Sequence, residues 1–324
     1  MTIKPYYETE LGKLYHGDCL SIMPQLEPVD LVLTDPPYNI CKAEWDKWKK
    51  ESDYIEFMGL VFLGCQRVLK DNGSFYWFHN DMERVAMLVV WLKENTNFIF
   101  KQFVVVDKID NSYISDLYGS QEQLRNFISI AEYCLFYTFQ DKTGLQTIMG
   151  DYGNFISIKK YLRNEKNRFE KSGTKLKDIT KWTKCFHAFA EGQSFSFPTE
   201  NTYNKMRELT GFFRREYEDL RREYEDLRYT FNARSGLKNV WEYAFKNEKQ
   251  YKHPTQKPIK LICDILKYSS NEGNTVLDCF VGSGTTAVAC ERLKRRWIGI
   301  DIEEKYCEIA AKRIEQERKQ LKLF

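Results

Sequence analysis

The sequence predicts a doubly wound α/β fold, in which helices cover both faces of a largely parallel sheet. Short segments such as 29–34 and 275–280 are almost continuously apolar, as strands buried on both faces of a sheet must be. Each of them runs into a loop that is followed by a helical pattern, and this alternation indicates an α/β sheet. A stretch of different composition separates the two α/β regions, so we expect an inserted, mostly helical segment.

Composition narrows the class of protein further. The 324 residues carry a formal net charge of +3, which is too small by itself to indicate a polyanionic partner. The nine cysteines never form a C-x-x-C pair, so we expect reduced, buried thiols in a cytoplasmic protein and no metal site. The N-terminus is polar and the most apolar run, residues 85–92, is too short to cross a bilayer, so we expect no membrane association.

The N-terminal region contains a strand, residues 29–34, that ends at Asp35-Pro36-Pro37-Tyr38, where two prolines prevent further strand pairing. Apolar spacing predicts a helix from Ser52 to Leu69. Asp71-Asn72-Gly73 predicts a turn before a strand at residues 74–78. Further strands are expected near residues 98–106 and 131–139.

The composition changes after about residue 140, where Lys and Arg outnumber Asp and Glu between residues 156 and 186. Further on, Arg214–Leu220 is repeated as Arg221–Leu227, which places Tyr217, Leu220, Tyr224 and Leu227 at heptad spacing. Two heptads are too few for a free coiled coil, so we expect a helix docked on the core, with a dimer contact or a DNA contact as alternatives. The predicted organisation is residues 1–140, an insert at 141–237, and residues 238–324.

The C-terminal region has the pattern of a nucleotide-type site. A strand, a turn containing Gly282 and Gly284, a helix from Thr285 and a strand ending in Asp301 form the start of a dinucleotide-type half-fold. Glycines let the backbone approach a ligand, and the acid can accept hydrogen bonds from ribose hydroxyls. The spacing differs from G-x-G-x-x-G, and no phosphate-binding lysine follows. A ligand with ribose but no pyrophosphate, such as S-adenosylmethionine, fits this pattern.

The C-terminal region offers only two strands of this half-fold, one before and one after the glycine turn, so we expect the N-terminal region to supply the others. The sheet is then a circularly permuted, Rossmann-like one. Asp18 would follow its third strand, near the amino group of the ligand's adenine, and Asp35 its fourth strand, beside the same ligand. Asp18 also has the simpler interpretation of a helix cap before Cys19.

The Asp35–Tyr38 loop suits chemistry on an exocyclic amino group, whose lone pair is delocalised into the base. The Asp35 carboxylate and the Pro36 carbonyl can accept hydrogen bonds from the two N–H groups of this amino group. Pro36 and Pro37 together stiffen the loop. Tyr38 offers a flat face on which a flipped-out base can stack. His79 and Asn80 follow a neighbouring strand, where they either line this pocket or cap a loop.

Three motifs resemble those of the amino-methyltransferases of restriction–modification systems: Asp35–Tyr38, Phe280–Gly284 and His253–Pro258. Their order resembles the permuted β class, in which the Asp-Pro-Pro-Tyr form usually accompanies adenine N6 methylation. The resemblance implies a class I methyltransferase fold and transfer of a methyl group from S-adenosylmethionine to adenine N6 in DNA, leaving S-adenosylhomocysteine. It implies a catalytic loop at Asp35, Pro36, Pro37 and Tyr38, and a cofactor site formed by Asp18, Phe280, Gly282, Ser283, Gly284, Thr285 and Asp301, with His253 or Lys257 at the methionine carboxylate.

The basic insert is where we expect DNA phosphates to bind, through Lys159, Lys160, Arg163, Lys166, Arg168, Lys171 and Lys181. Four alternatives stay open: methylation of cytosine N4, of RNA, of a protein amide, or a non-catalytic DNA-binding relative. Two further partners also stay open, a second copy of the chain and a cognate restriction endonuclease.

Overall fold

The computed structural model describes residues 3–40, 46–108, 131–139, 156–171, 197–227, 229–232, 238–244 and 256–321. The chain divides into two compact units, one formed by residues 1–139 and 230–324 and the other by residues 140–229. The chain thus returns to the first unit at residue 230. The sequence pattern had predicted this boundary at residue 238.

The described part of the first unit is built on a nine-stranded sheet, in the order β1-β2-β9-β8-β3-β4-β6-β5-β7. The strands are Tyr7–Glu8 (β1), Gly12–His16 (β2), Val29–Thr34 (β3), Leu69–His79 (β4), Ile99–Lys108 (β5), Ala131–Thr138 (β6), Val240–Tyr243 (β7), Thr275–Asp278 (β8) and Arg296–Asp301 (β9).

The centre of this sheet combines strands from both ends of the sequence. β9 and β8 lie between β2 and β3, and all four run parallel. Val32 of β3 lies opposite Leu277 of β8, and neither side chain is exposed to solvent. The order confirms the predicted circular permutation, and it brings the carboxyl ends of strands from both regions to one edge.

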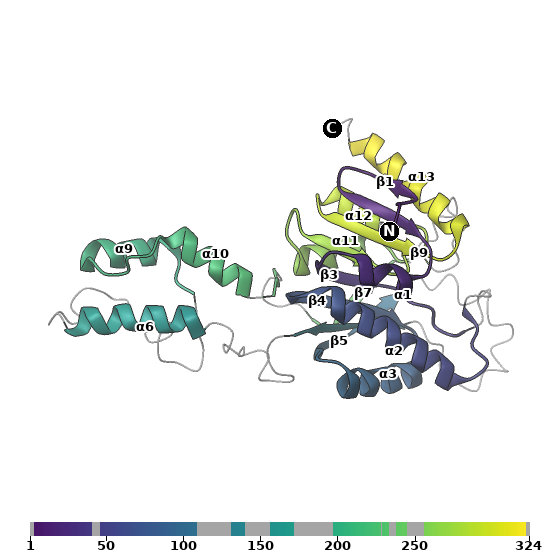
Figure 1. The fold of residues 1–324 in the computed structure, drawn as a ribbon, viewed down its shortest axis with the longest axis horizontal. Coiled ribbons are helices and arrows are strands. Elements are labelled where there is room, and N and C mark those ends of the chain that lie inside the picture. The colour runs from purple at the N-terminus through teal and green to yellow at the C-terminus, as the bar shows by residue number, and fades with distance from the viewer. Residues whose placement is uncertain are drawn as a thin grey trace. The chain divides into compact units, whose positions relative to one another are not determined.

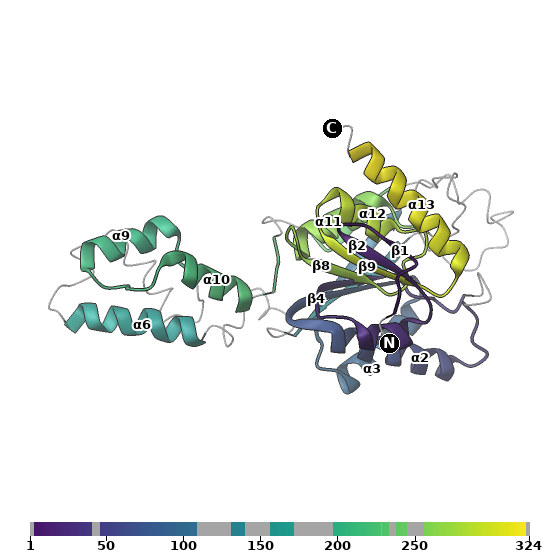
Figure 2. The ribbon, with the colours of Figure 1, turned by 45° about the horizontal axis from the view of Figure 1, so that its top comes forward.

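Helices cover both faces of the sheet (Figures 1 and 2). One face carries Cys19–Ile22 (α1), Glu51–Val68 (α2) and Met82–Asn95 (α3), with a short 3-10 turn at Met23–Gln25 (η1). The other carries Ile259–Ser269 (α11), Thr285–Arg292 (α12) and Glu304–Leu321 (α13). α2 forms as predicted because its apolar residues recur at helical spacing and are buried: Tyr54, Met58, Val61, Phe62, Cys65 and Val68.

The expected turn at Asp71-Asn72-Gly73 is wrong, because β4 continues through it for 11 residues. Val29 of β3 pairs with Leu69, and Leu31 pairs with Ser74, so the residues between Leu69 and Ser74 bulge out of the ladder. Beyond β4 the sheet becomes antiparallel, since β6 pairs in that direction with both β4 and β5.

The described part of the second unit contains Ile156–Lys171 (α6), Glu200–Thr210 (α9) and Tyr217–Leu227 (α10). They pack around a small apolar cluster of buried side chains: Ile158, Leu162, Tyr203, Met206, Phe213 and Leu220. The heptad residues Tyr217, Tyr224 and Leu227 pack against the same cluster. The repeat therefore forms a docked helix, within the inserted unit's own core. Among the helices that the structure describes, none has the length and apolar character needed to cross a membrane.

Candidate functional site

A cavity of about 290 Å³ opens in the first unit where the parallel strands β2, β3, β8 and β9 end. Parallel α/β sheets bind ligands at this edge because their loops converge there. The cavity brings together most of the predicted catalytic and cofactor residues: Asp18, Asp35, Pro36, Pro37, Tyr38, Lys257, Phe280, Gly282, Ser283, Thr285 and Asp301. His253 lies outside the described residues.

The glycine turn after β8 is shaped by two glycines with positive φ and by the Asp301 carboxylate. Gly282 has a φ of 51°, and its N–H donates to Asp301 Oδ2 at 2.9 Å. Gly284 is not among the residues lining the cavity. It has a φ of 83°, and a Cβ there would lie 3.0 Å from the Ala310 Cβ, so only glycine fits without strain. Gly284 shapes the turn, and Gly282 gives it an open backbone at the cavity.

Two acids predicted for the cofactor site line the cavity and also hold backbone groups. Asp301 Oδ1 accepts the Glu303 N–H at 2.9 Å, and burial raises the pKa of its carboxyl to about 6. Each of its oxygens keeps a second lone pair for a ligand hydroxyl. Asp18 accepts the Leu20 N–H at 3.0 Å as the cap of α1, so the helix-cap interpretation holds together with the pocket position.

Asp278, at the end of β8, is a pocket residue that sequence reasoning missed. Its carboxylate accepts the hydroxyls of Thr34 at 3.1 Å and Thr286 at 2.6 Å, and the N–H of Phe280 at 3.1 Å. Burial raises the pKa of Asp278 to about 6. These bonds tie the end of β3, just before the catalytic loop, to the glycine turn. An acid at the end of an apolar strand was the available signal.

The carboxylate of Asp35 is engaged on both oxygens. Lys257 Nζ donates to Oδ2 at 2.6 Å, and the Tyr38 hydroxyl donates to Oδ1. Lys257 also donates to the Tyr38 hydroxyl at 3.1 Å and lies 3.1 Å from Glu132 Oε2. The other oxygen of Glu132 pairs with Lys108 at 2.6 Å. One ammonium group is thus shared between two carboxylates and a phenol.

The pKa values in this cluster follow from burial and charge. Burial raises the pKa of Asp35, Lys257 opposes that rise, and Glu132 adds to it. Burial also opposes ionisation of Glu132, but Lys257 and Lys108 outweigh it and lower the pKa of Glu132. The pKa of Tyr38 stands well above its ordinary value, because its hydroxyl is buried beside Asp35.

Lys257 was one of two alternatives, with His253, for the contact to the cofactor's methionine carboxylate, and in the structure its ammonium lies against Asp35 and Glu132. Glu132 was not predicted at all. It lies on β6, whose antiparallel pairing with β4 cannot be read from local sequence, and no motif marks it.

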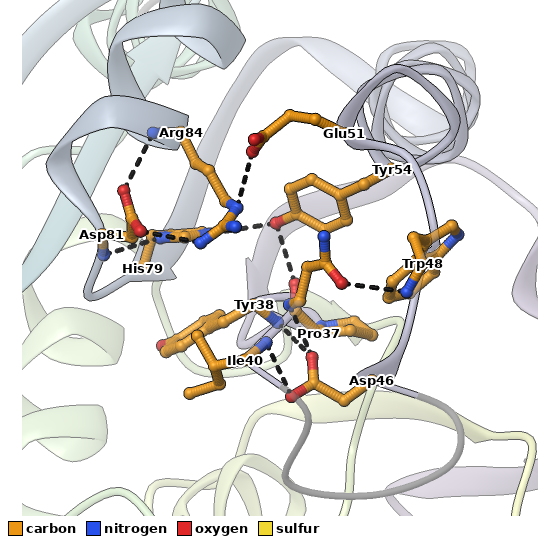
Figure 3. Close-up of polar contacts among 11 residues, drawn as sticks. Pro37, Tyr38, Ile40, Asp46, Trp48, Glu51, Tyr54, His79, Asp81 and Arg84 are labelled. Carbon is orange, nitrogen blue, oxygen red and sulfur yellow. Dashed lines mark hydrogen bonds and ion pairs between the residues drawn. The ribbon is translucent and has the colours of Figure 1, made fainter.

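Asp46 closes the turn after the catalytic loop (Figure 3). Its Oδ1 accepts the N–H groups of Tyr38 at 2.8 Å and Asn39 at 2.6 Å, and its Oδ2 accepts that of Ile40 at 3.2 Å. Asn39 has a φ of 57°, and its side chain accepts the Trp48 N–H at 2.9 Å. A single carboxylate therefore satisfies three successive backbone donors.

The predicted DNA contacts fall on α6 of the second unit. Lys160 and Arg163 are exposed on this helix, and Lys159 is half-buried. Arg168 forms an ion pair with Glu165 at 2.7 Å. Lys166 is only 6% exposed, which leaves little of its side chain open to a phosphate, and its role as a DNA contact stays a prediction. The Lys171 side chain and Lys181 lie outside the described residues.

Comparison with known proteins finds similar chains among DNA-modifying enzymes. The chain is 28% identical to the type II methyltransferase M.BamHI of Bacillus amyloliquefaciens over 99% of its length, and it spans 61% of that protein. It is 29% identical to M2.DpnII of Streptococcus pneumoniae, covering 97% of this chain and 93% of the relative. It is 25% identical to the DNA adenine methyltransferase YhdJ of Escherichia coli K12, covering 95% and 84%.

Two solved structures share the fold. The PvuII DNA methyltransferase, named as cytosine-N4-specific, has a TM-score of 0.59 at 13% identity, covering 97% of this chain and 94% of that one. The M1.HpyAVI–SAM complex has a TM-score of 0.53 at 20% identity, covering 94% and 98%. These likenesses confirm the predicted fold class. The family model described as DNA methylase matches residues 29–312. Since that match spans most of the sequence, the chain belongs to the N6/N4 DNA methylase family.

Proposed function

We propose that this chain transfers a methyl group from S-adenosylmethionine to the N6 amino group of an adenine flipped out of DNA. One observation carries the proposal: the Asp35–Tyr38 loop and the glycine turn with Asp301 line a single cavity. A base amino group bound at Asp35 would therefore lie beside a cofactor bound at Asp301. Base flipping is required because the amino group is otherwise paired and stacked inside the duplex.

The cavity's residues fit the cofactor. Asp301 can accept ribose hydroxyls, Asp18 can accept the adenine amino group, and Phe280 offers an apolar face. The open turn at Gly282, Ser283 and Thr285 lets the ligand approach the backbone. We keep His253 as a candidate for the methionine carboxylate and place Lys257 with the catalytic loop. When bound, the cofactor supplies an electrophilic methyl group on a sulfonium.

The catalytic loop raises the nucleophilicity of the target nitrogen. The Asp35 carboxylate and the Pro36 carbonyl accept hydrogen bonds from the two N–H groups of the target nitrogen. These hydrogen bonds draw the lone pair of the nitrogen out of conjugation with the base. Tyr38 stacks on the base and holds it in line. The nitrogen loses a proton as it is methylated, and Asp35, whose pKa burial raises, is the acceptor at hand.

The preference for adenine has separate support. The aspartate form of the motif accompanies adenine N6 methylation in the family that it resembles, and the similar YhdJ is named an adenine methyltransferase. Cytosine N4 offers the same chemistry to the loop, and the PvuII enzyme of similar fold is named for that base. Product analysis must therefore separate the two.

The test is mass spectrometry of nucleosides from unmethylated bacterial DNA treated with the protein and S-adenosylmethionine. We expect N6-methyladenine; N4-methylcytosine without N6-methyladenine would overturn the choice of base. Asp35→Ala should abolish transfer while S-adenosylhomocysteine still binds in calorimetry. Transfer near the wild-type rate would mean that Asp35 is not the key acceptor.

We assign DNA phosphate contacts to α6 of the second unit, where Lys160 and Arg163 are exposed. A second copy of the chain and a cognate restriction endonuclease remain predictions for its other partners.

A further inference from the structure

A buried hydroxyl and imidazole lie behind the catalytic loop (Figure 3). Tyr54 comes from α2 and His79 from the end of β4, and neither side chain is exposed to solvent. The Tyr54 hydroxyl lies 2.9 Å from His79 Nε2 and 2.9 Å from the Pro37 carbonyl oxygen. His79 Nδ1 accepts the Asp81 N–H at 2.9 Å. The four groups form one continuous chain of hydrogen bonds that ends on the loop.

The direction of this chain is fixed by its two ends. The Asp81 N–H can only donate, so Nδ1 of His79 carries no proton. The Pro37 carbonyl can only accept, so the Tyr54 hydroxyl must donate to it. The remaining bond then runs from the His79 Nε2–H to the Tyr54 oxygen, which requires the neutral Nε2–H tautomer. Burial favours this neutral form, since it lowers the pKa of His79 to about 4, with Arg84 and Lys257 also lowering it and Asp81 opposing them.

His79 supports the loop at a second point. Its ring stacks on the ring of Tyr38, with centroids 4.6 Å apart and planes inclined by 29°. Tyr38 lines the cavity, whereas His79 and Tyr54 do not. His79 therefore contacts the loop directly through a ring and indirectly through a hydroxyl, without reaching the cavity itself.

Charged groups fix the spacing between Tyr54 and His79. Arg84 in α3 pairs with Glu51 in the first turn of α2 at 2.8 Å, and with Asp81, the N-cap of α3, at 2.7 Å. These ion pairs join the start of α2, one turn before Tyr54, to the segment that follows His79. The two residues are thus held by the scaffold, and the loop is held by them.

We propose that Tyr54 and His79 are positioning residues for methyl transfer. They pin the Pro37 carbonyl and back the Tyr38 ring, so that the Asp35 carboxylate and the Pro36 carbonyl face the target amino group. The proposal rests on the proposed role of the Asp35–Tyr38 loop. A displacement of reacting groups by about 1 Å can cost about 100-fold in rate, so the loss of one pinning bond is measurable.

The decisive variant is Tyr54→Phe, which removes one oxygen atom and keeps the ring. Its matched control is Tyr76→Phe on β4: Tyr76 is also buried, and its hydroxyl lies 2.7 Å from Ser269 Oγ, away from the loop.

Rates are measured in single turnovers with tritium-labelled S-adenosylmethionine and unmethylated bacterial DNA. We expect Tyr54→Phe to slow transfer by at least about tenfold, with unchanged affinities for S-adenosylhomocysteine and DNA. The control should retain the wild-type rate at a similar melting temperature. Equal rates for the two variants would overturn the proposal.

A double variant tests whether the two residues act through one chain. His79→Phe keeps a flat ring against Tyr38 but removes both hydrogen bonds. If the chain acts as a unit, combining it with Tyr54→Phe should be no slower than the slower single variant. Rate losses that multiply would contradict a shared path. Should His79→Phe not fold, Tyr54→Phe and its control decide alone.

Failure of this proposal can be told apart from failure of the proposed function. An active wild-type enzyme with an inactive Asp35→Ala variant and a normal Tyr54→Phe variant removes only the positioning role. A wild-type protein that methylates neither base removes both.

Discussion

Lys257 supplies the positive charge that lies between the carboxylates of Asp35 and Glu132. Its ammonium lies 2.6 Å from Asp35 and 3.1 Å from Glu132, and its side chain is almost fully buried. Both carboxylates raise the pKa of Lys257 against the effect of burial, which lowers it, so the lysine stays charged. Burial raises the pKa of Asp35, Lys257 lowers it, and Glu132 adds to the rise.

We therefore predict that Lys257→Met moves the acid limb of the kcat profile to higher pH. Removing the ammonium raises the pKa of Asp35 further, so the carboxylate that accepts the target N–H is present only at higher pH. Activity at neutral pH should fall and partly recover as the pH rises. Rates measured from pH 5.5 to 9 check this, with Lys70→Met as the control, because Lys70 pairs with Asp30 and neither residue lines the cavity. An acid limb at the wild-type position would contradict the prediction.

Among the site residues, the sequence could predict those that form contiguous motifs. Asp35–Tyr38 and Gly282–Thr285 are short runs whose chemistry can be read without knowing the fold. Glu132 and Asp278 reach the site through long-range packing. Asp46 folds back on the loop from six to eight residues away. No local pattern marks Glu132 or Asp46. The roles of Tyr54 and His79 depend on hydrogen bonds between α2 and β4. The sequence left open whether His79 lined the pocket or capped a loop, and the structure places it behind Tyr38.

The catalytic loop, taken as an element, keeps its shape because Asp46 accepts three backbone N–H groups. A loop of two prolines followed by a left-handed Asn39 exposes donors that have no strand or helix partner. A carboxylate can accept all of them at once, whereas an amide can use only its oxygen as an acceptor.

We predict that Asp46→Ala slows methyl transfer and lowers the free energy of unfolding by about 1–3 kcal/mol, the usual cost of leaving a buried polar group unpaired. Asp46→Asn should fall between the alanine variant and the wild type. Urea unfolding and single-turnover rates measure the two effects, and Asp53→Asn, an exposed acid in the first turn of α2, is the control. An alanine variant as fast and as stable as the control would show that the loop needs no such acceptor.

Among the longer elements, α2 was predictable because its burial follows a single helical period. The start of β4 was not, since Asp71-Asn72-Gly73 has turn chemistry but lies in a bulge that keeps strand pairing. The direction of strand pairing was equally unpredictable from the sequence. β5 and β6 have ordinary strand patterns, and only their long-range pairing makes them antiparallel.

For the whole molecule, the fold and the site come from the same permuted order. β8 and β9 carry the glycine turn and Asp301, and they pair with β2 and β3, which carry Asp18 and Asp35 at their ends. Parallel pairing puts all four ends at one edge, so the cavity is a consequence of strand order. The sequence supported this inference because a nucleotide-type half-fold needs partners for its two strands.

The second unit has its own apolar cluster, so its contribution to DNA binding can be measured separately from cofactor binding in the cavity. We predict that Lys160→Gln with Arg163→Gln weakens DNA binding and leaves the affinity for S-adenosylhomocysteine unchanged. Each phosphate contact contributes about 0.9 to the slope of log K against log salt, so the double variant should flatten that slope by about 2. The control is Lys312→Gln with Lys319→Gln on α13, which changes the net charge equally in the first unit. Fluorescence anisotropy with duplex DNA at several salt concentrations measures both. If the two double variants flatten the slope equally, the attraction belongs to net charge, and α6 makes no located contact with phosphates.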